Sequence, residues 1–530
     1  ELVLDQGRPS FALIHFYPGN AVHVRAREEL PVNVWTHLAV TYDGSSRAEG
    51  IGLWIDGRPL DLEFLRDNLY RDILHRGEWG DDTGGVELTL AGRFRDSGLR
   101  NGAIDELAIF DRPLTAIEVR TLARQGSDLP LNVTREERIE VQVENQDPAV
   151  KLARIELKKA RDAENDLVGN VREIMVMKEL PDRRSTHVLR RGVYSQPGEP
   201  VEPATPEGIL ELSAELPRNR AGLASWLIDR RNPLTARVVV NRIWRIHFGR
   251  GIVATQEDFG NQGQLPTHPE LLDWLASRLM DSGWDLKGLH RLIVTSATYR
   301  QSSQAEPRTL AADPDNLWLA RGPKHRLSAE QIRDSVLAVS GLLSTRIGGP
   351  SAKPYQPAGL WEESGTGKAY VQDHGENLYR RSLYTFWRRT APPPTMLTFD
   401  ATSREVCTAK RETTATPLQS LVLLNDPQVL EAARVLAERL LARADRTSDQ
   451  RIEQAFLTVI GRSASARELS ILRRMLDEQR AWFRSNPGEA QKYLAAGEFP
   501  RDEALPADEL AAFAVVVHAC FNHDEFVMQR

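Results

Sequence analysis

The stretch Trp35-Thr-His-Leu-Ala-Val-Thr-Tyr42 decides the fold of the front of the chain. Leu38, Val40 and Tyr42 fall on one face and polar or small residues on the other, which is the period of a half-buried β-strand. By the same alternation, Trp35 and Tyr42 are predicted to lie in a core. Further β-branched and aromatic runs, separated by Pro, Gly, Asn and Asp, occupy residues 11–16, 21–25, 51–55, 86–92 and 102–110. The pattern predicts an antiparallel β-sandwich.

Two local signals predict a turn and a helix within this first segment. Asp56-Gly57 supplies the positive φ angles of a tight hairpin turn between residues 51–55 and the following Arg58-Pro-Leu. Residues 114–122 then predict a short helix with Thr115 as N-cap and Glu118 three residues later.

The composition describes an ordinary multidomain protein. The chain has 530 residues with 41% hydrophobic and 27% charged side chains, and its longest apolar stretch, near residues 511–521, contains His518. We therefore predict no transmembrane helix. The net charge of −6 does not by itself indicate nucleic acid. Because the chain begins at Glu1 without an initiator Met or a signal-like segment, we expect a fragment or a processed product.

The motifs of the first segment resemble a known family. Trp35-Thr-His-Leu-Ala-Val-Thr-Tyr-Asp-Gly44, Leu53-Trp-Ile-Asp-Gly57 and Gly102-Ala-Ile-Asp-Glu-Leu107 occur in order, followed by Leu114-Thr-Ala-Ile-Glu-Val119. Together they resemble the concanavalin A-like, laminin G-type jelly roll. The resemblance implies a curved two-sheet sandwich that binds glycans or proteins through a concave face or a rim calcium. Since relatives begin with further strands upstream, we expect the sandwich of residues 1–128 to be N-terminally incomplete.

Within this sandwich the aromatic candidates for stacking on sugar rings are Tyr17, Trp54, Tyr70 and Trp79. Packing in a core is the alternative for each of them. Asp105, beside Glu106, is a candidate calcium ligand. The alternative is that Asp105 closes a turn onto backbone amides.

Helical signals dominate the rest of the chain. We predict a charged helical connector over residues 129–178 and a mainly α-helical domain over residues 179–530. Helix starts are marked by capping residues at Asn232, Asp285, Ser328, Thr416, Asp426 and Ser465. Gly249 predicts the end of the helix that follows Asn232. One exception is Ser382-Leu-Tyr-Thr-Phe-Trp387, which predicts a strand.

A second resemblance covers residues from about Met175 to Phe526. The motifs that carry it are Met175-Val-Met-Lys-Glu-Leu180, Leu189-Arg-Arg-Gly-Val-Tyr194, Asn232-Pro-Leu-Thr-Ala-Arg-Val-Val-Val-Asn-Arg-Ile-Trp244, Asp258-Phe-Gly260, Pro266-Thr-His-Pro-Glu-Leu-Leu-Asp-Trp-Leu275, Ser296-Ala-Thr-Tyr-Arg-Gln-Ser302 and Leu423-Leu-Asn-Asp-Pro427. They resemble the planctomycete-type domain of unknown function 1553. The resemblance implies an exported protein, located in the periplasm or at the cell surface, with a c-type cytochrome domain upstream.

The cofactor expectations follow from the same resemblance. No Cys-x-x-Cys-His occurs in this chain, so any haem would belong to an upstream domain, and no cofactor other than the candidate calcium is predicted here. Cys407 and Cys520 form neither a disulfide framework nor a metal knuckle. The closing residues 519–526 depart from the usual family ending, which leaves Cys520 and His523 without an assigned role.

The helix predicted over residues 233–248 offers a candidate site. Arg237, Asn241 and Trp244 share one face of the helical wheel, where an oxygen-rich ligand could be bound and stacked. The alternative is a buried helix whose polar residues satisfy neighbouring backbone. Tyr299 and Arg300 could join the binding site, and the candidate acid–base residues are Asp258, His268, Glu270 and Asp273.

Arginine is concentrated in two stretches of the helical region. Residues 181–250 carry 12 Arg against 7 acidic residues, and residues 376–411 carry 6 Arg and one Lys against 3. Trp387, Arg388 and Arg389 lie in the second stretch and predict a surface for sulfated or uronic-acid polysaccharide. The alternative is that local carboxylates neutralise each arginine. Nucleic acid is disfavoured because no recognition-helix pattern accompanies the charge.

Two functions remain open from the sequence. The first is a non-catalytic extracytoplasmic protein that binds glycans within a polysaccharide-handling or surface assembly, together with upstream domains of its own chain. The second is a glycan-active or cytochrome-coupled enzyme with its site in the helical domain. Walker-type, Ser/His/Asp and His-x-x-x-His patterns are not found, which removes the commonest hydrolase, nucleotide and zincin interpretations.

Overall fold

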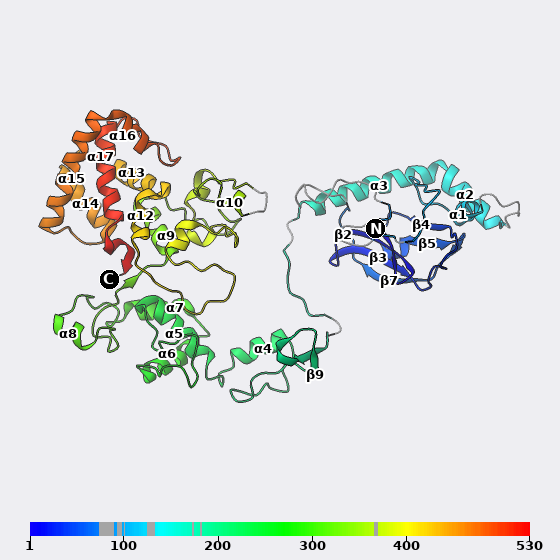
Figure 1. Cartoon of the computed structure of the whole chain (residues 1–530), viewed down its shortest axis with the longest axis horizontal. Coiled ribbons are helices and arrows are strands. Elements are labelled where there is room, and N and C mark those ends of the chain that lie inside the picture. The colour runs from blue at the N-terminus through cyan, green and yellow to red at the C-terminus, as the bar shows by residue number, and fades with distance from the viewer. Residues whose placement is uncertain are drawn as a thin grey trace. The chain divides into compact units, whose positions relative to one another are not determined.

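The computed structural model describes residues 1–73, 90–92, 98–99, 101–124, 133–171, 174–180, 183–364 and 369–529 (Figure 1). The chain separates into two compact units, Glu1–Leu180 and Pro181–Arg530. The first unit is rich in strands and the second is largely helical, as predicted from the sequence. Each unit is described below by itself.

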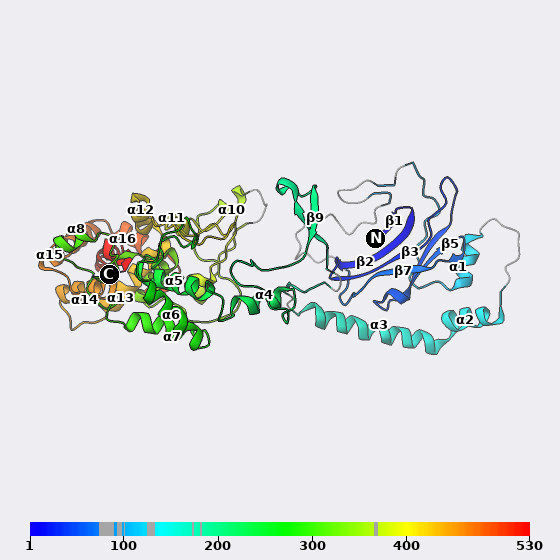
Figure 2. The same ribbon diagram turned by 90° about the horizontal axis from the view of Figure 1, so that it is seen from below.

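Unit 1 contains two antiparallel sheets. Four strands form one sheet in the order β1 (Leu2–Asp5), β2 (Arg8–Phe16), β3 (Asn20–Ala26) and β7 (Leu62–Asp67). Three strands form the other in the order β4 (Leu38–Tyr42), β5 (Ile51–Ile55) and β6 (Arg58–Pro59). Figure 2 shows the curvature of the four-stranded sheet. β7 follows the hairpin directly and was not anticipated from the sequence.

The core of unit 1 lies between these two sheets. Val22 and Val24 of β3 are fully buried together with Leu53 of β5, so alternate residues of both strands point inward. The hairpin between β5 and β6 uses Asp56 (φ 47°) and Gly57 (φ 80°), which confirms the predicted turn. A Cβ on Gly57 would lie 3.0 Å from the Cα of Arg120, so this position is also closed to side chains by packing.

Two expectations for unit 1 are corrected. β4 begins only at Leu38, so Trp35 lies outside the strand and is 71% exposed, whereas Tyr42 packs against the core as predicted. The run 102–110 pairs with no strand in the described part of the chain, and its Ile109 is 75% exposed. Residues 86–89 of the remaining predicted strand, like Trp79, lie outside the described residues.

Three helices complete unit 1: α1 (Ala116–Ala123), α2 (Arg135–Gln146) and α3 (Pro148–Gly169). The Glu118 carboxylate accepts hydrogen bonds from the backbone N and Oγ1 of Thr115 at 2.8 and 2.9 Å, which confirms the predicted start of α1. Arg161 of α3 donates to the carbonyl of Gly44, and Arg120 of α1 pairs with Glu137 of α2. The connector helices therefore contact the sandwich that precedes them.

Unit 2 contains fourteen helices among its described residues. They are α4 (Arg220–Leu227), α5 (Thr235–Phe248), α6 (Pro269–Asp281), α7 (Leu286–Thr295), α8 (Pro307–Ala312), α9 (Ala329–Ser340), α10 (Leu360–Glu363), α11 (Pro394–Thr398), α12 (Pro417–Asn425), α13 (Pro427–Leu441), α14 (Ser448–Ile460), α15 (Ala466–Ser485), α16 (Pro487–Leu494) and α17 (Ala507–Phe521). Two-stranded sheets pair β8 (Thr186–Leu189) with β9 (Pro197–Val201) and β10 (His325–Arg326) with β11 (Met528–Gln529).

The main core of unit 2 surrounds α17. Figure 1 shows α17 beside α13, with α14 and α15 around it. A helix that is apolar on all sides requires complete burial, and Leu510, Phe513 and Phe521 are each 0% exposed. His518 breaks the apolar run without cost because its Nε2 lies 2.8 Å from the carbonyl oxygen of Leu423. None of the described helices is long and apolar enough to cross a bilayer.

A second core joins α5, α6 and α7. α5 ends at Gly249, whose φ of 77° confirms the predicted left-handed stop. The caps at Asp285, Ser328, Asp426 and Ser465 are confirmed.

Thr416 is the N-cap residue of α12, as predicted, but the expected capping contact of its side chain is wrong. Its side chain accepts no capping hydrogen bond, and the Nε2 of Gln419 donates to the carbonyls of Thr398 and Thr414. The predicted strand 382–387 is also wrong. Ser382–Tyr384 form a 3₁₀ turn, and Thr385 makes only an isolated bridge with Ala352.

Candidate functional site

The outer face of the four-stranded sheet carries a polar track. On β3, His23 and Arg25 alternate with the buried residues Val22, Val24 and Ala26 and point away from the core. The Nε2 of His23 lies 2.7 Å from the Oγ of Ser10 on β2, and burial lowers the pKa of this imidazole. Arg25 reaches Asp5 at 2.6 Å and Glu63 at 2.9 Å, so its charge is neutralised. The positive charge of Arg25 is therefore fully used by carboxylates of its own sheet.

One end of this track differs from the centre. Tyr17, in the turn between β2 and β3, is 46% exposed and packs its ring edge-on against His23 with centroids 5.9 Å apart. The guanidinium of Arg66, on β7, lies 5.7 Å from the centre of the Tyr17 ring. Arg66 makes no ion pair within the described residues. We call Tyr17, His23 and Arg66 the Tyr17 corner, and it combines an exposed ring with an unneutralised cation.

The neighbouring aromatics have different roles. The Oδ1 of Asn20 accepts from the backbone N of Tyr70 at 2.9 Å, which brings the 48% exposed Tyr70 to the same end of the sheet. The half-buried Trp54 donates from Nε1 to the Oγ1 of Thr41 at 3.2 Å on the other sheet. Tyr70 is thus a second exposed ring near the Tyr17 corner.

Asp105, the candidate calcium ligand, is exposed and accepts from the backbone N of Glu106 at 2.9 Å. This is the local turn contact given above as its alternative role. No group of three or more His, Cys, Asp or Glu side chains is arranged for a metal ion in the described part of the chain. The calcium site stays a prediction.

The binding residues predicted on α5 have structural partners. Arg237 donates from Nε to Asp273 at 2.6 Å. Asn241 is fully buried, with Nδ2 donating to the carbonyl of Val253 and Oδ1 accepting from its amide. Trp244 is 6% exposed and stacks on Phe248 with centroids 4.1 Å apart. The geometry is that of a buried helix and leaves no open ring face.

The predicted acid–base residues are not assembled into one group. Asp258 accepts from the amide of Gly260 at 2.7 Å, and His268 contacts the Oγ1 of Thr267 at 3.0 Å. Glu270 is exposed, and none of the hydrogen bonds among the described residues joins two of the four candidates. A groove between α6 and α7 contains none of them, because it is lined by Arg278, Leu279, Ser282, Asp285, Gly288, Leu289, Arg291, Leu292 and Thr295.

Tertiary packing assembles a histidine pair that the sequence analysis missed. His247 on α5 and His290 on α7 lie 2.7 Å apart between Nε2 and Nδ1. The ring of Tyr299 packs edge-on against His247 at 5.7 Å, and its hydroxyl contacts Gln529, while Arg300 is exposed. Because 43 residues separate the histidines, no local spacing motif indicates them.

Several arginines of the two basic stretches have partners within the chain. Arg230 binds Asp281 and Arg231 binds Asp229, each at 2.8 Å. Arg380 is 2% exposed and donates to the carbonyl of Pro350 at 2.8 Å. These contacts match the alternative in which the arginines serve structure.

The remaining residues of the basic stretch fall into two groups. The Nε1 of Trp387 donates to the carbonyl of Ser403 at 3.0 Å, and Arg404 stacks over its ring at 4.4 Å. Arg388 makes no ion pair with a described carboxylate and lies 4.5 Å over the ring of Trp361, while Arg389 is exposed.

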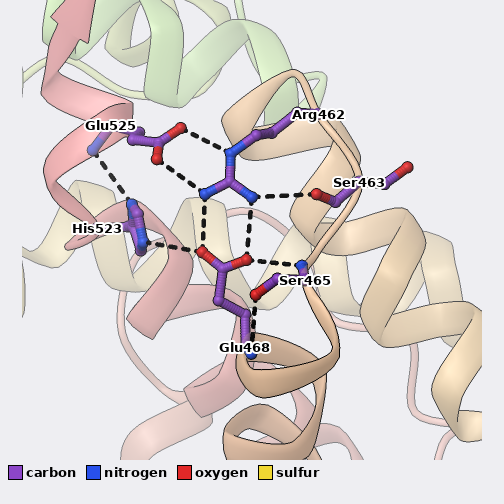
Figure 3. Close-up of polar contacts among 6 residues, drawn as sticks. All are labelled: Arg462, Ser463, Ser465, Glu468, His523 and Glu525. Atoms are coloured by element: carbon purple, nitrogen blue, oxygen red, sulfur yellow. Dashed lines mark hydrogen bonds and ion pairs between the residues drawn. The ribbon is translucent and has the colours of Figure 1, made fainter. Parts of the chain in front are cut away.

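The polar network around Arg462 serves structure (Figure 3). Its guanidinium binds Glu468, at the start of α15, at 2.7 and 3.0 Å and Glu525 at 2.8 and 2.9 Å. His523 accepts from the amide of Glu525 on Nδ1, so its Nε2 carries the proton and faces Glu468 at 3.8 Å. We call these four residues the Arg462 clasp, and it joins α15 to the end of the chain.

The two cysteines lie apart and are both free thiols. Cys407 is exposed, whereas Cys520 is buried in α17. Burial raises the pKa of the Cys520 thiol to about 12, which keeps it protonated and unreactive.

Comparisons with known proteins agree with both resemblances seen in the sequence. Residues 2–120 match the Concanavalin A-like lectin/glucanases superfamily. Residues 219–476 match the family described as Protein of unknown function (DUF1553). The chain therefore has a region similar to concanavalin A-like lectins and glucanases, followed by a region similar to the DUF1553 family. No curated protein matches the chain significantly.

Among solved structures, an S-layer domain-containing protein from Clostridium thermocellum matches with 26% sequence identity and a TM-score of 0.13. The match covers 22% of this chain and 52% of that chain, so the present chain spans about half of it. At this TM-score the likeness supports no conclusion about the fold or function of the present chain.

Proposed function

We propose that this protein binds glycans outside the cytoplasm, and that the Tyr17 corner of its concanavalin A-like domain holds an acidic sugar. The observation that carries the proposal is the lectin-superfamily match over residues 2–120, which includes the polar outer face of the four-stranded sheet. The DUF1553 match and the lectin-like domain together support the extracytoplasmic location.

The chemistry of the Tyr17 corner favours an acidic sugar over a neutral one. A half-exposed tyrosine ring offers an apolar surface with little conformational entropy to lose. The guanidinium of Arg66 beside it donates from Nη1 to the carbonyl of Leu65 at 2.6 Å but has no carboxylate partner among the described residues, so its remaining N–H groups can bind a carboxylate or sulfate. Each sugar unit of a sulfated or uronic-acid polysaccharide can provide both an apolar ring face for Tyr17 and an anionic group for Arg66.

The test uses the full chain and a panel of sulfated, uronic-acid and neutral polysaccharides at about 0.05 and 0.5 M salt, where screening differs. Tyr17→Ala should weaken binding of the acidic polymers at least about tenfold, or ~1.4 kcal/mol. Arg66→Ala should remove the salt dependence. The control is Tyr194→Ala, which removes an 88% exposed tyrosine from unit 2.

Two results would contradict the proposal. Equal and salt-insensitive affinity for acidic and neutral polymers would eliminate the acidic-sugar assignment. If Tyr17→Ala leaves polysaccharide binding unchanged, the Tyr17 corner is not the binding site. The enzyme alternative stays a prediction, and release of reducing ends from the same panel tests it.

A further inference from the structure

The indole of Trp361 in α10 is buried with an unused hydrogen-bond donor. Trp361 is 6% exposed, and its Nε1 has no hydrogen-bond partner among the described residues. Tyr370 packs edge-on against the ring at 5.1 Å, and Phe386 lies 5.6 Å away. Buried polar groups are nearly always paired, and leaving one unpaired costs about 1–3 kcal/mol. The unpaired Nε1 therefore calls for an acceptor.

Two cations surround the same ring. The guanidinium of Arg388 lies 4.5 Å from the ring centre, and its Nη1 is also buried without a hydrogen-bond partner in the part of the chain that the structure describes. The Nζ of Lys353 lies 5.7 Å from the Trp361 ring and 5.4 Å from that of Phe386. Neither cation forms an ion pair with a described carboxylate.

The acidic side chains that follow Trp361 in the sequence are exposed, and the one bound to the backbone of Lys353 is already used. Asp373 accepts from the backbone amide of Lys353 at 2.7 Å, and Glu362 and Glu363 are exposed on α10. Farther along the same segment, the Nε2 of Gln356 is a third buried donor without a partner. Every unsatisfied atom here is a donor, so the missing partner must supply acceptors.

A second tryptophan in the same unit shows that an arginine over an indole does not require this deficit. Arg404 lies 4.4 Å over Trp387, nearly the spacing of Arg388 over Trp361. The Nε1 of Trp387, however, donates to the carbonyl of Ser403 at 3.0 Å. Stacking of an arginine on a tryptophan therefore does not by itself leave the indole N–H unpaired. The unused donor is a feature of the Trp361 environment.

We propose that Trp361, Arg388 and Lys353 form a binding site for an oxyanion group, namely a carboxylate, sulfate or phosphate. One oxygen of the group accepts from the Nε1 of Trp361 and another from the Nη1 of Arg388, while Lys353 adds positive charge. This Trp361 site lies in unit 2 and does not depend on the Tyr17 corner.

The direct test follows the indole N–H resonances of the ¹⁵N-labelled full chain during titration with sulfate, phosphate, acetate and glucuronate, with glucose as the neutral control. One indole resonance should shift with the anions and not with glucose. It should be missing in Trp361→Phe, which keeps a ring but removes Nε1. The anion that binds most tightly identifies the source of the group. No anion-dependent indole shift up to about 100 mM, a weak-affinity limit, would overturn the proposal.

Variants supply an independent readout of the same site. Arg388→Ala should weaken anion binding at least about tenfold and abolish the anion-induced rise in the unfolding temperature. The matched control, Arg404→Ala, removes the guanidinium from the satisfied tryptophan and should bind anions like the wild type. Equal losses in the two variants would overturn the assignment to Trp361, and so would wild-type affinity in Arg388→Ala. The wild-type titration remains decisive if a variant does not fold.

Discussion

Arg462 and Arg388 are both arginines of the helical unit, yet their surroundings are opposite. Arg462 is gripped by Glu468 and Glu525, so its charge and its donors are used within the chain. Arg388 lies over Trp361 without a described carboxylate partner and keeps a buried donor unused. Arginine content by number therefore says little about ligand binding. The partners of each guanidinium separate a structural role from a binding role.

The largest effect is expected from breaking the Arg462 clasp. Arg462→Ala leaves two partly buried carboxylates facing each other, so we expect a loss of about 2–3 kcal/mol in the free energy of unfolding, after allowing for screening of an arginine that is 40% exposed. Urea unfolding of the full chain measures it. Arg473→Ala, on the same helix α15, removes an exposed ion pair with Asp449 and should cost less than about 1 kcal/mol. Equal losses in the free energy of unfolding of the two variants would show that the Arg462 clasp stabilises the fold no more than an exposed ion pair does.

The clasp also predicts a pH dependence. Hydrogen bonds from Arg462 hold the pKa of Glu468 well below its usual 4.5. Because the folded-state pKa lies below the unfolded-state value, this stabilisation is present above about pH 4.5 and is lost as the pH falls through the folded-state pKa. The difference in the free energy of unfolding between wild type and Arg462→Ala should therefore stay constant from about pH 7 to about pH 5 and narrow as the pH falls below about 4.5. A constant difference would contradict the assignment.

A second buried glutamate sharpens the comparison because its shift has the opposite sign. Glu431 on α13 is 0% exposed, accepts from Tyr379 at 3.0 Å and from the amide of Phe499 at 2.7 Å, and leaves Oε2 unpaired. Burial raises its pKa above 4.5, so its contribution to stability is present below about pH 4.5 and is lost as the pH rises through the folded-state pKa.

Glu431→Gln keeps the accepting oxygen but cannot ionise. Relative to wild type its free energy of unfolding should rise as the pH increases from about 5 to about 8. Thermal unfolding at the two pH values measures the gain. Glu478→Gln, at an exposed position of α15, should show no such trend, and a matching trend there would refute the burial argument.

The smallest effect is expected at Arg389, which adjoins Arg388 in the sequence but is exposed. Arg389→Ala should change the free energy of unfolding by less than about 0.5 kcal/mol. It should also leave the anion titration of the indole resonances unchanged. A loss of anion binding in this variant would extend the Trp361 site to the surface arginine.

Local signals carried most of the fold prediction. The caps at Thr115, Asp426 and Ser465 and the Asp56-Gly57 turn depend on contacts within a few residues, and the structure confirms each of them. The prediction that Trp35 lies in the core is wrong, because alternation shows which residues share a face but not where a strand begins.

The candidate site was harder to predict from the same sequence. A helical wheel placed Arg237, Asn241 and Trp244 on one face, but it could not show that other helices and the loop at Val253 cover that face. Arg388 was singled out by charge, yet its position over Trp361 depends on residues 27 positions apart in the chain.

By itself the sequence determined the strand-rich front, the helical remainder, the two family resemblances and the helix ends, because periodicity and capping act over a few residues. Only the tertiary structure decided which arginine meets a carboxylate and which meets an indole. It also brought Tyr17, in the turn between β2 and β3, to Arg66 on β7, and it brought His247 on α5 to His290 on α7. These outcomes depend on the burial and pairing of residues distant in the sequence. The cost of desolvation then determines how much each polar group contributes to stability.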